Sequence, residues 1–170
     1  YKGDTAVAQA AAFDPTPANI DAHTLTFTLP SGMQVALLPK GARGQAVKAR
    51  LTLRYGDEKS LFGVGDVPEF TAALLDRGTP SMTRQQIQDR FEALQAEVSF
   101  GAGDTAATVS ITTTRANLPA VIALVGDILR NASFPAADLE ELRQQTLSAI
   151  EAQRTEPDAL VSTALARHGD

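Results

Sequence analysis

The chain has 170 residues, a length sufficient for one well-buried domain. Its 44% hydrophobic and 21% charged residues are typical of a globular protein, and a net charge of −5 without a basic stripe argues against nucleic acid as a main partner. The lack of cysteine excludes disulfides, thiol nucleophiles and Cys-based zinc sites, and no apolar run approaches the roughly 20 residues of a membrane-spanning helix.

The first segment, Tyr1 to about Ala22, is rich in Ala, Asp and Pro and has no clean periodicity. We therefore interpret residues 1–23 as a linker or N-terminal arm. Because the chain starts without an initiator methionine or a basic leader, we expect it to be a piece of a longer protein. Near the other end, Ala159–Ala166 predicts a helix after which the chain soon stops, so we expect the domain to be truncated there.

Three strands are predicted next. Leu25–Leu29 alternates apolar and polar residues, a turn signal follows at Pro30–Gly32, and Met33–Leu38 is the returning strand. After a second loop, Val47–Arg54 alternates again. Strands joined by such short turns indicate an antiparallel sheet.

Two helices with start signals follow. Asp66 and Glu69 form a D-x-x-E pattern that predicts helix capping, and Gly78 is suited to the position after the helix end. A second helix is predicted from Thr83, with Gln86 at the third helical position as its capping partner.

The last part of the chain is predicted to be a hairpin and then helices. The hairpin strands are Val98–Phe100 and Ala107–Thr113, around a glycine-containing turn. Helices are predicted over Asn117–Asn131 and after Phe134-Pro135, the latter ending near Pro157. Runs of strands followed by runs of helices predict an α+β fold: a mostly antiparallel sheet with helices packed on one face.

Four short motifs in this order resemble the pitrilysin/insulinase-type (inverzincin) zinc metallopeptidases. They are Leu29–Val35, Arg54–Glu58, Leu74–Thr79 and Phe134–Glu140. The resemblance covers most of the chain, from about Thr24. It implies a peptidase-like α+β domain over residues 24–170, as in a single domain of the mitochondrial-processing-peptidase-like metallohydrolases.

The family's catalytic residues are missing from these frames. When the family's motif is aligned on Gly78-Thr79, Glu69 replaces the first His of H-x-x-E-H. Ala72 then replaces the catalytic Glu, and Ala73 replaces the second His. Two His at i and i+4 share a metal, and the Glu acts as general base on metal-bound water. In the later frame E-R-x-V-x-L-x-E, Leu142 and Ala149 replace both acids, Ala149 at the third-ligand position. The resemblance therefore implies the first domain of a degenerate, non-catalytic half, with no catalytic, cofactor-binding or metal-binding residue.

The resemblance also implies a partner. Family members pair a metal-bearing half with a degenerate half, on one chain or as two subunits, and form a clamshell chamber that holds an extended peptide. We therefore expect a catalytic H-x-x-E-H half in cis or in trans, zinc in that half but not in this chain, and a peptide substrate. The resemblance to exported bacterial members and the lack of cysteine favour the periplasm, with the cytoplasm as the alternative.

The individual candidate residues favour structural roles. Glu69 is better suited to a helix cap than to a metal ligand. His23 and His168 each have no second histidine nearby, whereas catalytic zinc takes three protein ligands. Two other functions stay open: an enzyme with unrelated acid-based chemistry at Asp57, Glu58 or Glu69, and a stand-alone protein-interaction module.

Overall fold

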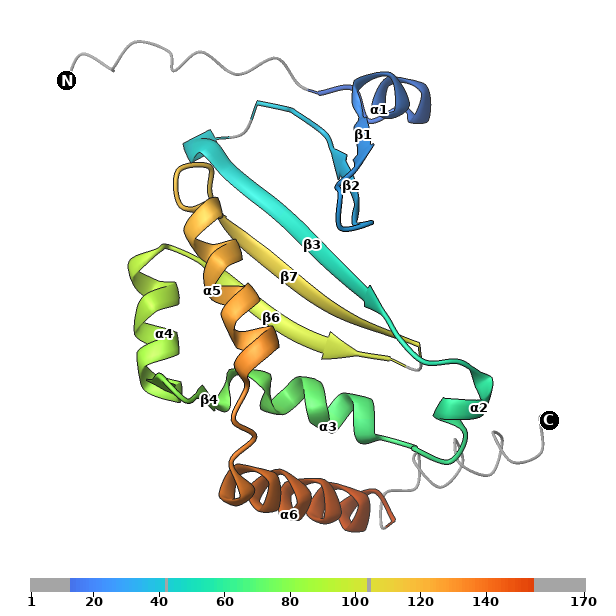
Figure 1. The fold of residues 1–170 in the computed structure, drawn as a ribbon, viewed down its shortest axis with the longest axis vertical. Coiled ribbons are helices and arrows are strands. Elements are labelled where there is room, and N and C mark those ends of the chain that lie inside the picture. The colour runs from blue at the N-terminus through green and yellow to red at the C-terminus, as the bar shows by residue number, and fades with distance from the viewer. Residues whose placement is uncertain (1–12, 42, 104, 155–170) are drawn as a thin grey trace. The chain divides into compact units, whose positions relative to one another are not determined.

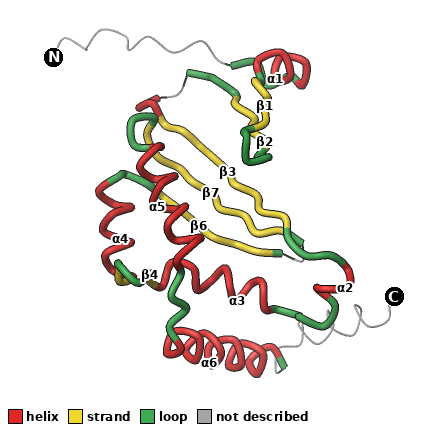
Figure 2. The backbone as a smooth tube through the Cα atoms, in the orientation of Figure 1, coloured by secondary structure: helices red, strands yellow, loops and turns green. Residues whose placement is uncertain are grey.

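The computed structural model of the protein describes residues 13–41, 43–103 and 105–154. The chain divides into two compact units between Val47 and Lys48. In chain order (Figures 1 and 2) the elements are α1 (Pro17–His23), β1 (Leu25–Thr28), β2 (Gln34–Leu37), a 3-10 turn η1 (Arg43–Gln45), β3 (Ala46–Arg54), α2 (Glu58–Leu61), α3 (Val67–Leu74), a 3-10 turn η2 (Leu75–Arg77), β4 (Gly78–Thr79), β5 (Met82–Thr83), α4 (Arg84–Ala93), β6 (Glu97–Ala102), β7 (Ala106–Thr114), α5 (Leu118–Asn131) and α6 (Ala136–Gln153).

The first unit contains a short helix that the sequence pattern did not predict. Helix α1 lies inside the segment interpreted as an arm, begins with Pro17 in its first turn and has no buried residue. A seven-residue helix without a buried face leaves no apolar period in the sequence, so periodicity could not find it. Residues 1–12 lie outside the described residues, and the arm boundary after residue 23 stays a prediction.

The first two predicted strands are confirmed as the hairpin β1–β2, with Leu25 opposite Leu37 and Phe27 opposite Val35. The third, β3, belongs to a different ladder, because the sheet of the second unit has the order β3-β7-β6. An alternating pattern predicts a strand with one buried face, but it does not predict which strand pairs with it. Long-range packing decides that pairing.

Strand β7 is the centre of that sheet. It pairs antiparallel with β6, so that Val98 lies opposite Ile111 and Phe100 opposite Val109. On its other side, the N–H of Tyr55, just after β3, donates to the carbonyl of Thr105, just before β7, at 3.1 Å. The three strands lie side by side in Figures 1 and 2, and the predicted α+β fold with antiparallel sheets is confirmed.

Helices α4 and α5 bury their apolar faces against this sheet. The core combines side chains of both helices with those on one face of β7: Ile87, Phe91, Val109, Ile111, Val121, Leu124, Val125 and Ile128. The helix predicted over Asn117–Asn131 is thus confirmed as α5, whose buried residues are Val121, Leu124, Val125 and Ile128. Two polar groups fix the end of α4, because Thr113 Oγ1 and Asn117 Nδ2 both donate to the carbonyl of Leu94, at 3.0 and 2.9 Å.

Helix α6 packs far less. It starts after Pro135 as predicted and has no buried residue. Leu142 and Thr146 are half-buried, whereas Leu139 and Ile150 are exposed. The predicted stop at Pro157 lies outside the described residues. In the part of the chain that is described, no single helix has the length and apolar composition to cross a membrane; α5 and α6 reach that criterion only as a pair, bent by 89°.

Candidate functional site

Helix α3 carries the three positions of the zinc-binding frame. It starts after Asp66 as predicted, but the Asp66 carboxylate makes no capping hydrogen bond. The predicted D-x-x-E cap is therefore wrong. Capping needs the N-cap backbone in the β region, whereas Asp66 has ψ 6°, and Pro68 removes one of the amide donors that a cap would satisfy.

The three frame residues of α3 differ in exposure. Glu69 is exposed, Ala73 is half-buried, and Ala72 is only 4% exposed. In the active frame the residue at position 72 would be the general base, which must reach water. Here that position belongs to the packed side of the helix, where a methyl group is well accommodated and an ionised carboxylate would be desolvated.

Helices α3 and α6 lie beside each other in the second unit (Figures 1 and 2). Arg77, just after α3, connects them through a 3.9 Å ion pair from its Nη1 to Asp138 Oδ1. Helix α6 carries the later frame, with Leu142 half-buried and Ala149 exposed. The helices that the resemblance assigns to the metal ligands are therefore neighbours, while the ligands are replaced.

Within residues 13–41, 43–103 and 105–154, no group of three or more His, Cys, Asp or Glu residues is placed to hold a metal ion. His23 closes the last turn of α1, where its Nδ1 lies 2.8 Å from the carbonyl of Asn19 and its ring meets that of Phe13 edge-on. His168 lies outside these ranges. That the chain holds no zinc stays a prediction.

Two of the three acids proposed for unrelated chemistry, Asp57 and Glu58, line a shallow hollow of about 540 Å³ together with Lys59 and Phe62, whereas Glu69 does not line it. Asp57 caps helix α2: its carboxylate accepts from the Ser60 N–H at 2.8 Å, and Ser60 Oγ accepts from the Asp57 N–H at 2.9 Å. The backbone and side-chain hydrogen bonds from Ser60 lower the pKa of Asp57. An exposed carboxylate held ionised by a helix cap is poorly suited to acid–base catalysis near neutral pH.

The carboxylate of Glu140 on α6 accepts hydrogen bonds from two neighbouring side chains of the same helix. Arg143 donates to both of its oxygens, at 2.9 and 2.8 Å, and Gln144 donates to one of them, and these bonds lower the pKa of Glu140 to about 2. Because the folded-state pKa is depressed, the interaction stabilises the fold above the ordinary Glu pKa and is lost as the pH falls towards 2.

An NMR titration of the Glu140 carboxyl is therefore expected to show a midpoint near 2 in the wild type. In Arg143→Gln the midpoint should move up towards the ordinary glutamate value, because the bidentate cation is lost. The matched control Arg90→Gln removes a charge from α4 and should leave the midpoint in place. A wild-type midpoint at the ordinary value would show that solvent breaks the pair.

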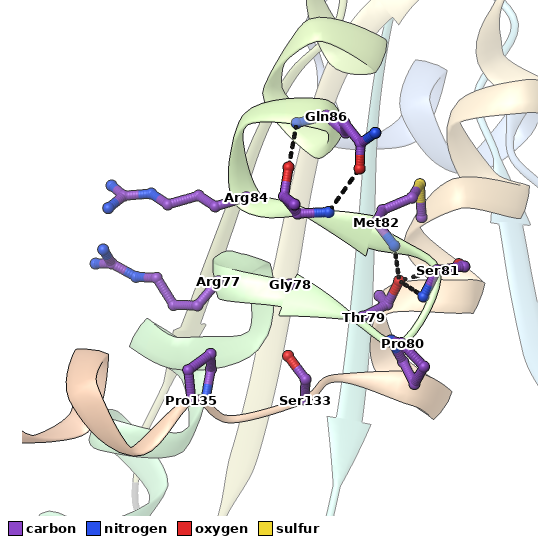
Figure 3. A pocket seen from close by; sticks show the side chains of 11 residues that line it. Arg77, Gly78, Thr79, Pro80, Ser81, Met82, Arg84, Gln86, Ser133 and Pro135 are labelled. Atoms are coloured by element: carbon purple, nitrogen blue, oxygen red, sulfur yellow. Dashed lines mark hydrogen bonds between the residues drawn. The ribbon is translucent and has the colours of Figure 1, made fainter.

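A shallow hollow of about 390 Å³ lies where the ribbon β4–β5 meets the loop between α5 and α6 (Figure 3). Thr79 Oγ1 accepts from the N–H of Met82 at 3.1 Å and shapes the turn of the ribbon. The predicted start of α4 is confirmed beside it, because Thr83 Oγ1 accepts from the Gln86 N–H and Gln86 Oε1 accepts from the Thr83 N–H. Two of the sequence motifs, Leu74–Thr79 and Phe134–Glu140, supply part of its walls, but they lie about fifty positions apart and their sequences do not predict that they meet.

Comparison with known proteins identifies the fold. No protein-family model and no curated protein matches the sequence. A peptidase M16 inactive domain from Pseudomonas fluorescens matches with a TM-score of 0.69 and 24% identity, over 84% of this chain and 34% of that chain. The chain has an M16-like fold. A protease from Helicobacter pylori matches with a TM-score of 0.62 and 14% identity, over 81% of this chain and 33% of that chain.

The M16-like fold agrees with the resemblance drawn from the sequence motifs. The first neighbour is itself described as an inactive domain. At these identities the likeness concerns the fold, and this chain spans about a third of the length of each neighbour.

Proposed function

We propose that this chain is a non-catalytic domain of a zinc metallopeptidase assembly, which pairs with a metal-bearing half and helps to enclose an extended peptide. One observation carries the proposal: in an M16-like fold, α3 lies beside α6 and β6, and the resemblance puts Glu69, Ala72 and Ala73 at the positions of H-x-x-E-H. The helix serves the architecture, and the partner half supplies zinc and general base.

The edge of the sheet supports the peptide-holding part of the proposal. The order β3-β7-β6 places β6 at an edge, and α3 lies close to it. Among the described residues, no backbone hydrogen bond joins β6 (Glu97–Ala102) to an element other than β7. Unpaired edge groups accept an extended peptide as an additional strand, with affinity from the main chain and little dependence on sequence.

Metal content tests the non-catalytic part. After incubation with zinc and removal of free metal, the purified chain is expected to retain well below one zinc per molecule. Stoichiometric zinc would overturn this part of the proposal. Peptidase activity that survives a chelator would overturn it in favour of acid-based chemistry.

Reconstitution tests the pairing. Adding this chain to a zinc-bearing H-x-x-E-H half from the same genome is expected to give a stable complex with higher peptidase activity than that half alone. No complex, and no change in activity, would favour a stand-alone interaction module. We also propose a periplasmic location, on the resemblance to exported members; fractionation of the source cells tests it, and recovery in the cytoplasmic fraction would contradict it.

Peptide backbone chemistry tests strand addition in that complex. A substrate peptide N-methylated at alternate residues, so that the amides facing β6 cannot donate, is expected to bind much more weakly. The control peptide carries the same methyl groups shifted by one residue, onto the amides that face away. Equal loss with both peptides would show that the peptide is not held as an added strand.

A further inference from the structure

The sheet β3-β7-β6 has a polar face on the side away from α4 and α5. In β3, Ala49 and Leu51 pack against the core, so the residues that alternate with them point to the other side. In β7, Val109 and Ile111 are buried in the same core. We call the opposite surface the open face. It is formed by Lys48, Arg50, Thr52 and Arg54 of β3, Thr108, Ser110 and Thr112 of β7, and Glu97, Ser99 and Gly101 of β6.

The charge of the open face is concentrated in β3. Lys48, Arg50 and Arg54 are all exposed, and β3 contains no acidic residue. The whole chain has 20 acidic and 15 basic residues, so a strand with cations alone departs from the composition. The acid of the open face is Glu97, which pairs with Thr112 and is separated from β3 by the whole of β7. A positive potential therefore follows the length of β3.

The three cations of β3 are not neutralised by the described part of the chain, where every ion pair lies on other elements. Asp57 and Glu58 follow β3 in the sequence, but neither forms an ion pair with Arg54, and Asp57 caps α2. Side chains on the same face of a strand recur about every 7 Å, so Lys48 and Arg50 repel each other. A negatively charged partner would remove this repulsion.

The open face also has hydroxyl groups that the fold does not use. Thr52 is exposed, and Ser110 and Thr112 are half-buried. Within the described residues, none of these three hydroxyls is hydrogen-bonded. By contrast Thr113, on the other face of β7, donates to the carbonyl of Leu94 at 3.0 Å. Hydroxyls both donate and accept, so they suit the amides and carboxylates of a peptide.

We propose that the open face binds an acidic segment of an extended peptide, with carboxylates on Lys48, Arg50 and Arg54. The proposal rests on the proposed function, because it makes this face a wall of the space that encloses the peptide. In an extended peptide, alternate side chains point to one side with the same spacing as the cations of β3. Arginine donates paired hydrogen bonds to a carboxylate, which gives geometry as well as attraction.

A peptide fits the open face better than a single-stranded nucleic acid does. Binding of single strands relies on aromatic side chains on which the bases stack. The three strands contain one aromatic residue, Phe100, and it packs against the core on the other side of the sheet. The open face therefore offers charges and hydroxyls but no stacking surface.

Fluorescence anisotropy with a labelled peptide of alternating Glu and Thr residues, long enough to span β3, tests the proposal. The salt concentration is about 0.1 M, at which exposed charges more than about 10 Å away are screened. Saturable binding to the purified chain is expected. Peptides with Gln or Lys in place of Glu, and an oligothymidylate of the same charge, should bind at least about tenfold more weakly, since they lose the carboxylates.

Paired variants assign the binding to β3. The double variant Lys48→Gln, Arg50→Gln is expected to weaken binding of the Glu peptide by about fivefold or more. The control Arg84→Gln, Arg90→Gln removes the same charge from α4, on the other side of the sheet, and should change affinity by less than about twofold. All four positions are exposed, so both variants should unfold at the wild-type urea midpoint.

Three results would overturn the proposal: no saturable binding of the Glu peptide, equally tight binding of the Lys peptide or the oligothymidylate, or equal loss in the two double variants. Equal loss would mean that the cations of β3 serve only to protect a sheet edge. The measurement uses this chain alone and is independent of the zinc and reconstitution tests. A chain that pairs with the catalytic half but does not bind the Glu peptide would therefore contradict the open face and leave the proposed function intact.

Discussion

Ala72→Glu, which restores the acid of the active frame, is expected to destabilise the fold by about 2–5 kcal/mol. Ala72 is only 4% exposed on the packed side of α3. A glutamate there adds volume to a filled site and removes a carboxylate from water. In the part of the chain that the structure describes, no cluster of metal-ligating side chains is placed to compensate the charge.

Urea unfolding of the purified variant measures this loss as a shift of the midpoint. The matched control is Ala149→Glu, the same substitution at an exposed position of α6 that also restores a family acid. It is expected to stay within about 0.5 kcal/mol of the wild type, as surface substitutions do. Equal midpoints for both variants would show that α3 accommodates an acid at position 72.

The pH dependence of Ala72→Glu gives a second test of the same burial. Desolvation favours the neutral form and raises the pKa of a buried carboxyl. A raised folded-state pKa means that the variant's deficit against the wild type is smallest below the ordinary glutamate value, roughly 4.3, and grows as the pH rises through the folded-state value. A deficit independent of pH would assign the loss to volume alone.

Local signals in the sequence were sufficient for helices α4 and α5. Thr83 and Gln86 form the capping box that their spacing predicts, and the apolar residues of α5 face the core. These features depend on residues within two helical turns of each other, so a local sequence pattern is sufficient to predict them. The Asp66 cap failed for an equally local reason, a backbone angle that the D-x-x-E pattern does not specify.

Features made by distant segments were not predictable in the same way. The partner of β3 is β7, which begins 60 residues later (Ala46 to Ala106), and alternation in either strand is compatible with several partners. The hollow likewise joins Gly78 to Ser133. In the zinc frame, spacing identified positions 69, 72 and 73, but only the packing of α3 showed that position 72 is buried while Glu69 is exposed.

Two isoleucines of α5 differ in burial, and we expect their replacement by alanine to differ in its effect on stability. Ile128 is fully buried in the core, whereas Ile122, on the same helix, is 52% exposed. Ile128→Ala is expected to lose about 2–5 kcal/mol, because it removes three carbons from a site that other helices and the sheet enclose. Ile122→Ala should lose less than about 1 kcal/mol, since most of that side chain already meets water.

Because both variants make the same chemical change in one helix, helix propensity cancels in their comparison. The difference between their unfolding free energies therefore reports how α5 is rotated against the sheet. The difference is also expected to persist in a complex with the proposed partner half, since Ile128 packs within its own unit. If Ile122→Ala proved the more costly in the isolated chain, α5 would present its other face to β7, and the core described for this unit would be wrong. If Ile122→Ala became costly only in the assembly, Ile122 would lie in the contact between the halves.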